Sequence, residues 1–151
     1  MTLASGERLI VDASVAIKWV APEPDSVRAA VLRNHHLIAP DLFFSECANI
    51  LWKKRRRGDL TDEQTSAAAR ILERADLVIV ASKGYLARAV SIAVDLDHPA
   101  YDAIYLAVAE AFGLRLVTAD DRLIRKTQQA GARFRNMLLP LSDISPAGYS
   151  A

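Results

Sequence analysis

Leu9-Ile10-Val11-Asp12 is the clearest indication of the architecture in this sequence. Three consecutive apolar residues that end at a carboxylate are typical of a short strand buried on both faces. Further apolar runs at 36–39 and 114–118 also predict strands, and the run at 77–80 predicts another strand buried on both faces. Because these runs alternate with segments of helical pattern, the sequence predicts an α/β fold.

The segments between the strands complete this prediction. Helices are expected over 14–20, 26–33, 42–57, 61–74, 82–95, 99–113 and 120–130, and a short edge strand over 134–139. The expected architecture is a three-layer α/β/α sandwich around a mostly parallel central sheet. Right-handed crossovers bring the carboxyl ends of parallel strands to one edge, where ligands bind in such folds.

Composition indicates one globular domain. The 151 residues are 52% hydrophobic and 25% charged, and no linker-like run divides them, so we expect a domain over 1–140 and a loose tail over 141–151. The net charge of +1 excludes a protein that coats nucleic acid through its overall charge. The single cysteine, Cys47, excludes an internal disulfide framework, and its apolar helical setting favours a small buried side chain. Without a signal peptide or an apolar run of roughly 18 residues, a cytoplasmic protein is expected.

Acidic residues stand at two of the expected strand ends. Asp12 follows the first strand and Asp120 follows the strand that ends at Thr118. Each is equally typical of a helix N-cap when taken alone. Asp102 is less ordinary, because it lies in the first turn of Tyr101–Phe112, a helix that is apolar around most of its circumference. A carboxylate there is costly unless a cation, a hydrogen bond or the helix N-terminus compensates.

Glu46 is the fourth acid of interest. By helical spacing it shares a face with Leu42, Phe43 and Ile50, so it is expected to point toward the interior. Asn49, one turn later, is positioned to orient its carboxylate. A salt bridge from Glu46 to an Arg or Lys elsewhere in the chain is the alternative interpretation.

If these four acids converge, their mutual repulsion requires a compensating cation. Oxygen ligands without Cys or His favour Mg²⁺ or Mn²⁺ over Zn²⁺. The candidate catalytic and metal-binding residues are therefore Asp12, Glu46, Asp102 and Asp120.

Four short motifs give the chain a family resemblance. They are Ile-Val-Asp-Ala-Ser at 10–14, Glu-Cys-Ala-Asn at 46–49, Tyr-Asp-Ala-Ile-Tyr-Leu-Ala at 101–107 and Leu-Val-Thr-Ala-Asp at 116–120. Because the motifs occur in the family's order, the chain resembles the PIN-domain ribonucleases, and among them the VapC-type toxins of toxin–antitoxin pairs. The third motif is the most specific.

The resemblance implies a parallel α/β/α sandwich with an acidic pocket that binds Mg²⁺ or Mn²⁺ and cleaves RNA. It also implies a homodimer that a small antitoxin neutralises. Carried over by residue, Asp12 and Asp102 are the principal metal ligands, and Glu46 and Asp120 complete the set. Ser14 and Thr118 match positions that hydrogen-bond around the site, whereas Asp121, a further supporting candidate, is equally suited to cap the next helix.

One or two ions held by these acids would hydrolyse a phosphodiester without a protein nucleophile. His98, which precedes Pro99 in an expected turn, is interpreted as a surface or packing residue. The basic run Lys53, Lys54, Arg55, Arg56 and Arg57 is a candidate for contacting the RNA backbone, although a solvated helix end is the more ordinary interpretation.

Other functions that use acids at strand ends remain open. A Mg²⁺-dependent phosphatase of the haloacid-dehalogenase type needs a second Asp two residues after the first, where this chain has Ser14. A non-catalytic receiver-like module carries paired acids after its first strand and a Lys after its last, and neither is clear here. A domain of this fold that only binds RNA or another partner is the third alternative.

Overall fold

A five-stranded sheet forms the centre of the protein in a computed structural model, which describes residues 1–146. The strands are β1 (Arg8–Val11), β2 (His36–Pro40), β3 (Leu77–Val80), β4 (Leu116–Thr118) and β5 (Leu138–Pro140). Their order is β3-β2-β1-β4-β5, and every neighbouring pair is parallel. The expected parallel sheet is confirmed.

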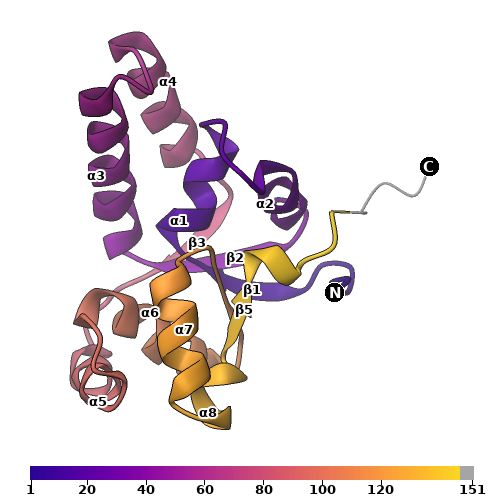
Figure 1. Ribbon diagram of the computed structural model, residues 1–151, viewed down its shortest axis with the longest axis vertical. Coiled ribbons are helices and arrows are strands. Elements are labelled where there is room, and N and C mark those ends of the chain that lie inside the picture. The colour runs from indigo at the N-terminus through magenta and orange to yellow at the C-terminus, as the bar shows by residue number, and fades with distance from the viewer. Residues whose placement is uncertain (147–151) are drawn as a thin grey trace.

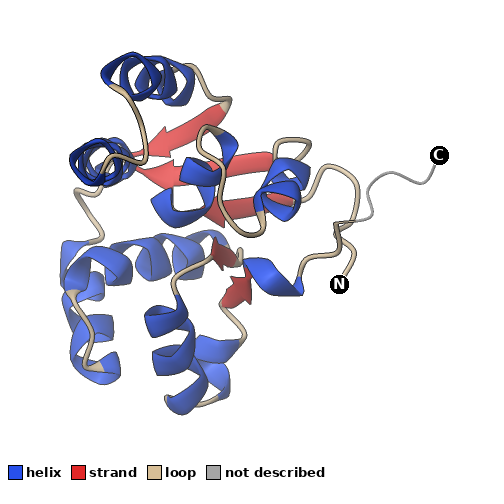
Figure 2. Cartoon of the chain, turned by 45° about the horizontal axis from the view of Figure 1, so that its top comes forward, coloured by secondary structure: helices blue, strands red, loops and turns tan. Residues whose placement is uncertain are grey.

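Helices cover both faces of this sheet, which gives three layers (Figures 1 and 2). The helices are α1 (Ala13–Ala16), α2 (Ser26–Leu32), α3 (Leu42–Arg57), α4 (Asp62–Glu73), α5 (Leu86–Leu96), α6 (Ala100–Phe112), α7 (Asp121–Gln129) and α8 (Ala132–Arg135), with 3₁₀ turns η1 (Ile17–Trp19) and η2 (Leu141–Asp143). Helices α3 and α4 form a hairpin that projects from the sheet in Figure 1.

Alternate residues of the strands enter two separate cores. Ile10 and Leu116 pack with α6 and α3, whereas Leu9, Val11 and Val117 pack with α1 and α2 on the other face. All five side chains are fully buried. This follows from the two-residue period of a strand, which sends successive side chains to opposite faces of the sheet.

The α3–α4 hairpin is closed by local signals. Gly58 ends α3 with φ +83°, a left-handed conformation in which glycine avoids the strain of a side chain. Thr61 then begins α4 with a capping box, in which its hydroxyl accepts from the Gln64 amide and the Gln64 side chain accepts from the Thr61 amide.

The structure differs from the sequence-based prediction in three segments. β3 lies at one edge of the sheet, and Val78 is 62% exposed there, so this strand is not buried on both faces. The expected strand over 134–139 is the short helix α8 followed by β5 at 138–140.

The third segment is the start of the expected loose tail. Leu141 and Ile144 are 1% exposed and pack into the core between the sheet and α2. The Ser145 amide donates a hydrogen bond to the Met1 carbonyl at 2.7 Å. Residues 141–146 are therefore part of the domain, and the rest of the expected tail lies outside the described residues.

Across residues 1–146, no helix is both long enough and apolar enough to cross a bilayer.

Candidate metal centre

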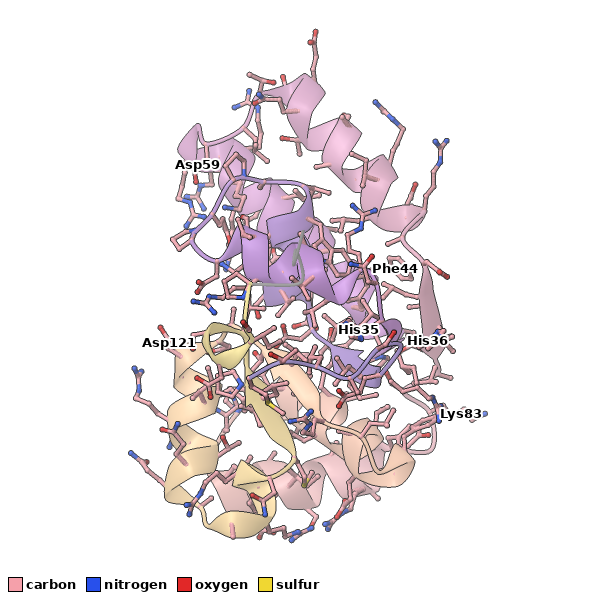
Figure 3. All side chains as sticks on the ribbon, turned by 90° about the vertical axis from the view of Figure 1, so that its right-hand side faces the viewer. His35, His36, Phe44, Asp59, Lys83 and Asp121 are labelled. Carbon is pink, nitrogen blue, oxygen red and sulfur yellow. The ribbon has the colours of Figure 1, made fainter. Side chains whose placement is uncertain are left out.

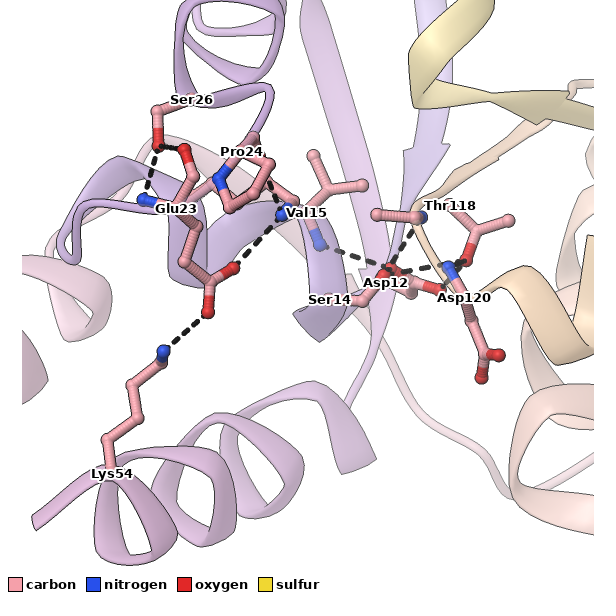
Figure 4. Close-up of polar contacts among 11 residues, drawn as sticks. Asp12, Ser14, Val15, Glu23, Pro24, Ser26, Lys54, Thr118 and Asp120 are labelled. Carbon is pink, nitrogen blue, oxygen red and sulfur yellow. Dashed lines mark hydrogen bonds and ion pairs between the residues drawn. The ribbon is translucent and has the colours of Figure 1, made fainter. Parts of the chain in front are cut away.

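Asp12 lies directly after β1, beside the end of the neighbouring strand β4. It is 5% exposed, and both of its carboxylate oxygens are engaged (Figure 4). The Ser14 hydroxyl donates to Oδ1 at 2.5 Å and the Thr118 hydroxyl donates to Oδ2 at 2.5 Å. The Val15 amide also donates to Oδ1, at 3.3 Å, so that Asp12 caps α1. These contacts fix the orientation of the carboxylate.

The carboxyl group of Asp12 is nevertheless difficult to ionise. Burial raises its pKa to about 6, and the charge of Asp102 acts in the same direction. The hydrogen bonds from Ser14, Thr118 and Val15 oppose this shift without cancelling it. Asp12 therefore lacks a compensating positive charge.

Asp102 lies in the first turn of α6, as expected, and contacts an imidazole. Nε2 of His98 is 2.5 Å from its Oδ2. Burial raises the pKa of Asp102, and His98 and Arg122 oppose the rise, whereas the charge of Asp120 adds to it. The carboxylate is thus held at one oxygen by a side chain that is itself 8% exposed.

Glu46 faces the interior from α3, as its helical spacing predicts. Burial raises its pKa to about 7, and the charges of the other three acids contribute to the rise. The Tyr105 hydroxyl of α6 lies close enough to lower the pKa of Glu46. Even so, Glu46 Oε1 and the Tyr105 hydroxyl are both buried without a partner that meets hydrogen-bond geometry. A buried oxygen left in this state is typical of a site that binds an ion or water.

Asp120 is the N-cap of α7. Its Oδ1 accepts from the amides of Arg122 at 2.9 Å and Leu123 at 3.2 Å. Its own amide donates to Thr118 Oγ1, which links it to the Asp12 cluster. Asp121 is exposed in the first turn of α7 and lies at the end of that helix in Figure 3. The residue that caps α7 is therefore Asp120, and not Asp121, for which the sequence also allowed this role.

The acids are close enough for their charges to raise the pKa values of Asp12, Glu46 and Asp102, but they do not form a finished ligand set. Among residues 1–146, no group of three or more Asp, Glu, His or Cys side chains is arranged to hold a metal ion as it stands. Asp12, Asp102 and Asp120 instead use nearby hydrogen-bond donors. The donor set still fits a hard divalent cation, because it is made of carboxylate oxygens and includes the unpartnered Oε1 of Glu46.

Most of the basic run at the end of α3 is paired with acidic side chains of the same chain. Lys54 is 7% exposed, and its Nζ lies 2.5 Å from Glu23 Oε1 (Figure 4). Arg55 pairs with Asp62. In the same run Arg57 lies 3.5 Å from Asp59, and Arg56 stacks over the Trp52 ring. Only Lys53 and Arg56 lack an acidic partner among the described residues, so the run is largely neutralised.

Two smaller expectations concern α3. Asn49 is exposed and makes no side-chain hydrogen bond to Glu46 in the described chain, so it does not orient that carboxylate. Cys47 is 3% exposed, and burial raises the pKa of its thiol to about 12. The cysteine is thus the small buried side chain that the sequence indicates.

Sequence reasoning missed two residues of the site. His98 lies in a turn, as the sequence predicts, but it contacts Asp102 in the first turn of α6 and is not only a surface or packing residue. Tyr105 belongs to the apolar pattern of α6, and its hydroxyl is turned toward Glu46. No local signal identifies either residue, because His98 lies before α6 and Tyr105 fits an apolar helix.

Comparison with known proteins identifies relatives along most of the chain. The PIN domain family model matches residues 9–128. Ribonuclease VapC3 of Pyrobaculum aerophilum is 36% identical over 126 residues, which cover 79% of this chain and 94% of that protein. Ribonuclease VapC3 of Mycobacterium tuberculosis is 33% identical over 129 residues, which cover 83% and 92% of the two chains.

A solved structure supports the same architecture. The crystal structure of PAE2754 from Pyrobaculum aerophilum has a TM-score of 0.64 and 28% identity, and the match covers 91% of this chain and 85% of that one.

Proposed function

The chain belongs to the PIN-domain family, and from this membership we propose that it is an endoribonuclease of the VapC toxin type that hydrolyses RNA phosphodiester bonds. The observation that carries the proposal is the set of four carboxylates around the ends of β1 and β4. Burial raises the pKa values of Asp12, Glu46 and Asp102, and no lysine or arginine forms a salt bridge with any of the four acids in the described chain.

We propose Mg²⁺ or Mn²⁺ as the cofactor. The residues that would hold it are Asp12, Glu46, Asp102 and Asp120, with Ser14 and Thr118 as supporting hydrogen-bond donors. Such an ion supplies positive charge at the scissile phosphate and lowers the pKa of water. Asp121 is left outside the ligand set because it is exposed in the first turn of α7.

The protein's own residues orient the carboxylates of the site. Ser14 and Thr118 hold the two oxygens of Asp12 in fixed directions, and His98 holds Asp102 by one oxygen. A water molecule attacks phosphorus and the P–O bond to the leaving ribose oxygen breaks, so a covalent protein nucleophile is unnecessary. The buried thiol of Cys47 is poorly suited to that role in any case.

The proposed partners follow from family membership. They are an RNA substrate, a small protein antitoxin that blocks the acidic site, and a second copy of the chain in a homodimer. Because RNA is the proposed substrate, we also propose that the protein acts in the cytoplasm.

The test is cleavage of labelled RNA by the purified chain with Mg²⁺ or Mn²⁺, with and without EDTA. The Asp12→Asn variant keeps the size of the side chain and removes its charge, so we expect a loss of cleavage of about 100-fold or more. Asp59→Asn is the matched control, because Asp59 is an exposed acid near the tip of the α3–α4 hairpin, away from Asp121 and the site (Figure 3).

Cleavage that persists in EDTA, or full activity in Asp12→Asn, contradicts the proposed mechanism. Release of phosphate from small phosphate esters without RNA cleavage favours the phosphatase. A stable acyl phosphate on Asp12 favours the receiver-like module. Loss of activity in both Asp variants points to damage unrelated to the site.

A further inference from the structure

An open groove lies beside the acidic site, between the end of α5, the turn that leads into α6, and α7. Its volume is about 590 Å³. The residues that matter for its chemistry are Val90, Val94, Asp97, His98, Arg122 and Lys126. The groove is therefore lined by two cations, one carboxylate, an imidazole and an apolar rim.

Two residues of the groove also interact with the candidate metal centre. His98 lines the groove and contacts Asp102 at 2.5 Å. Arg122 lines it from the first turn of α7, two residues after Asp120, and its charge acts on Asp102. The groove therefore adjoins the acidic site at Asp102.

The two cations of the groove are available to a ligand. Arg122 is exposed and forms no salt bridge within residues 1–146. Lys126 contacts only Asp97, at 3.7 Å, and that aspartate is fully exposed to solvent. An exposed pair at this distance is weak and easily exchanged. By contrast, Lys54 and Arg55 in the α3 run are held by acids at short distance.

Helical geometry directs both cations to the same side. Arg122 and Lys126 are four residues apart on α7, which places them on one face one turn apart. Arg125 lies on the same helix but does not line the groove. The cationic face is thus a defined feature of α7 rather than a general property of the helix.

We propose that this groove binds the backbone of a single-stranded RNA, with Arg122 and Lys126 contacting phosphates next to the scissile one. The inference rests on the proposed function and names the surface that holds its substrate. Charge supports RNA as the occupant, because a polyanion that approaches four carboxylates needs fixed cations at their margin. The net charge of +1 means that such cations have to be local.

The apolar rim is compatible with this occupant. Val90 and Val94 are 49% and 74% exposed at positions one turn apart on α5. They offer contact to ribose and base surfaces without reading sequence. We therefore expect binding that depends strongly on salt and little on base identity.

The test compares Arg122→Ala/Lys126→Ala with Arg125→Ala, which removes a cation from the same helix outside the groove. Binding of a fluorescently labelled, single-stranded oligoribonucleotide of mixed sequence is measured by anisotropy at several salt concentrations. An Asp12→Asn background with Mg²⁺ present prevents cutting. Cleavage by the wild-type chain and by each variant is measured in parallel.

We expect the double variant to weaken binding several-fold and to reduce the slope of log K against log salt by about 1.4, or about 0.7 for each lost phosphate contact. In cleavage, KM should rise while kcat changes little, because these contacts are made equally before and during the reaction. Arg125→Ala should match the parent protein in all of these measurements.

Three outcomes overturn the inference. One is that the double variant and Arg125→Ala bind RNA equally well while the parent protein still cuts RNA. This result leaves the proposed function intact. Another is a change in oligomeric state in the double variant without a change in RNA affinity, which assigns the groove to a second copy of the chain. The third is a parent protein that neither binds nor cuts RNA, in which case the proposed function fails as well.

Discussion

Nε2 of His98 lies 2.5 Å from Oδ2 of Asp102, so that a buried imidazole contacts the most specific acid of the sequence motifs. The contact joins the turn before α6 to the first turn of that helix. Since the His98 side chain is only 3% exposed, it has little freedom to turn away. The orientation of Asp102 therefore depends on a residue outside the acidic set.

His98→Ala should lower cleavage about 10- to 100-fold, the range found when a group that orients a metal-binding side chain is removed. We expect the loss to appear mainly as a weaker apparent affinity for Mg²⁺, because Asp102 keeps its charge but loses its orientation. The measurement is the cleavage rate as a function of Mg²⁺ concentration. His98→Gln, which retains a donor, should recover part of the activity. Equal Mg²⁺ dependence in all three proteins would show that the contact is only structural.

The buried acids should make the metal-free protein less stable as the pH rises. Asp12 and Glu46 have folded-state pKa values of about 6 and about 7, above the ordinary 3.8 and 4.5. Between about pH 4 and pH 7 the folded state therefore holds protons that the unfolded state has released, and its stability falls through this window. For Asp12 the loss is about 3 kcal/mol.

Thermal unfolding in EDTA at a series of pH values measures this effect. Asp12→Asn should flatten the decline, and its melting temperature at neutral pH should exceed that of the parent protein. Added Mn²⁺ should raise the melting temperature of the parent but not of Asp12→Asn. A melting temperature that increases between about pH 5 and pH 7 in EDTA contradicts the raised pKa values.

Lys54→Met should destabilise the fold by about 1 kcal/mol without weakening RNA binding, because Glu23 keeps Lys18 as a partner. Glu23 contacts Lys54 and Lys18, and although burial alone would raise the pKa of Glu23, these two cations hold it below its ordinary value. Removal of Lys54 leaves Glu23 with a single partner in a partly buried place. Urea unfolding measures the loss, and Lys53→Met, an exposed neighbour, should be close to neutral. If folded Lys54→Met binds RNA more weakly than the parent protein, Lys54 contacts RNA and this prediction is wrong.

Tyr105→Phe should reduce cleavage while leaving the fold intact. The hydroxyl is buried next to Glu46 without a partner of good geometry, so its loss costs no hydrogen bond in the metal-free protein. With metal present, we expect the Glu46 carboxylate to be less well oriented and kcat to fall several-fold. Cleavage kinetics and a melting curve separate the two effects. A large fall in melting temperature would instead assign Tyr105 to packing alone.

Much of the fold was readable because the strands are short, apolar and separated by helices with clear ends. Residues 9–11 predicted a buried strand, and the predicted bounds of α3 and α4 agree with the structure to within one residue. The exposed side of β3 was not readable, since Leu77–Val80 is as apolar as a central strand and only the strand order places it at the edge. Local pattern carries no information about that order.

The site was readable to the extent that its acids interrupt apolar patterns. Asp102 and Glu46 both point inward from apolar helices, as the patterns predict. The pairing of Lys54 with Glu23 joins residues 31 positions apart, and the groove of Arg122 and Lys126 requires three elements to meet. Such contacts depend on tertiary packing, so residue type and spacing do not reveal them.

Strand β3 leaves one side of the sheet open, with Val78 and Ile79 at its surface. Unpaired amide and carbonyl groups along such a margin can template the addition of a strand from another molecule. Concentrated or partly unfolded samples should therefore aggregate through this margin, and a lysine in place of Val78 would act as a gatekeeper that keeps the protein in solution.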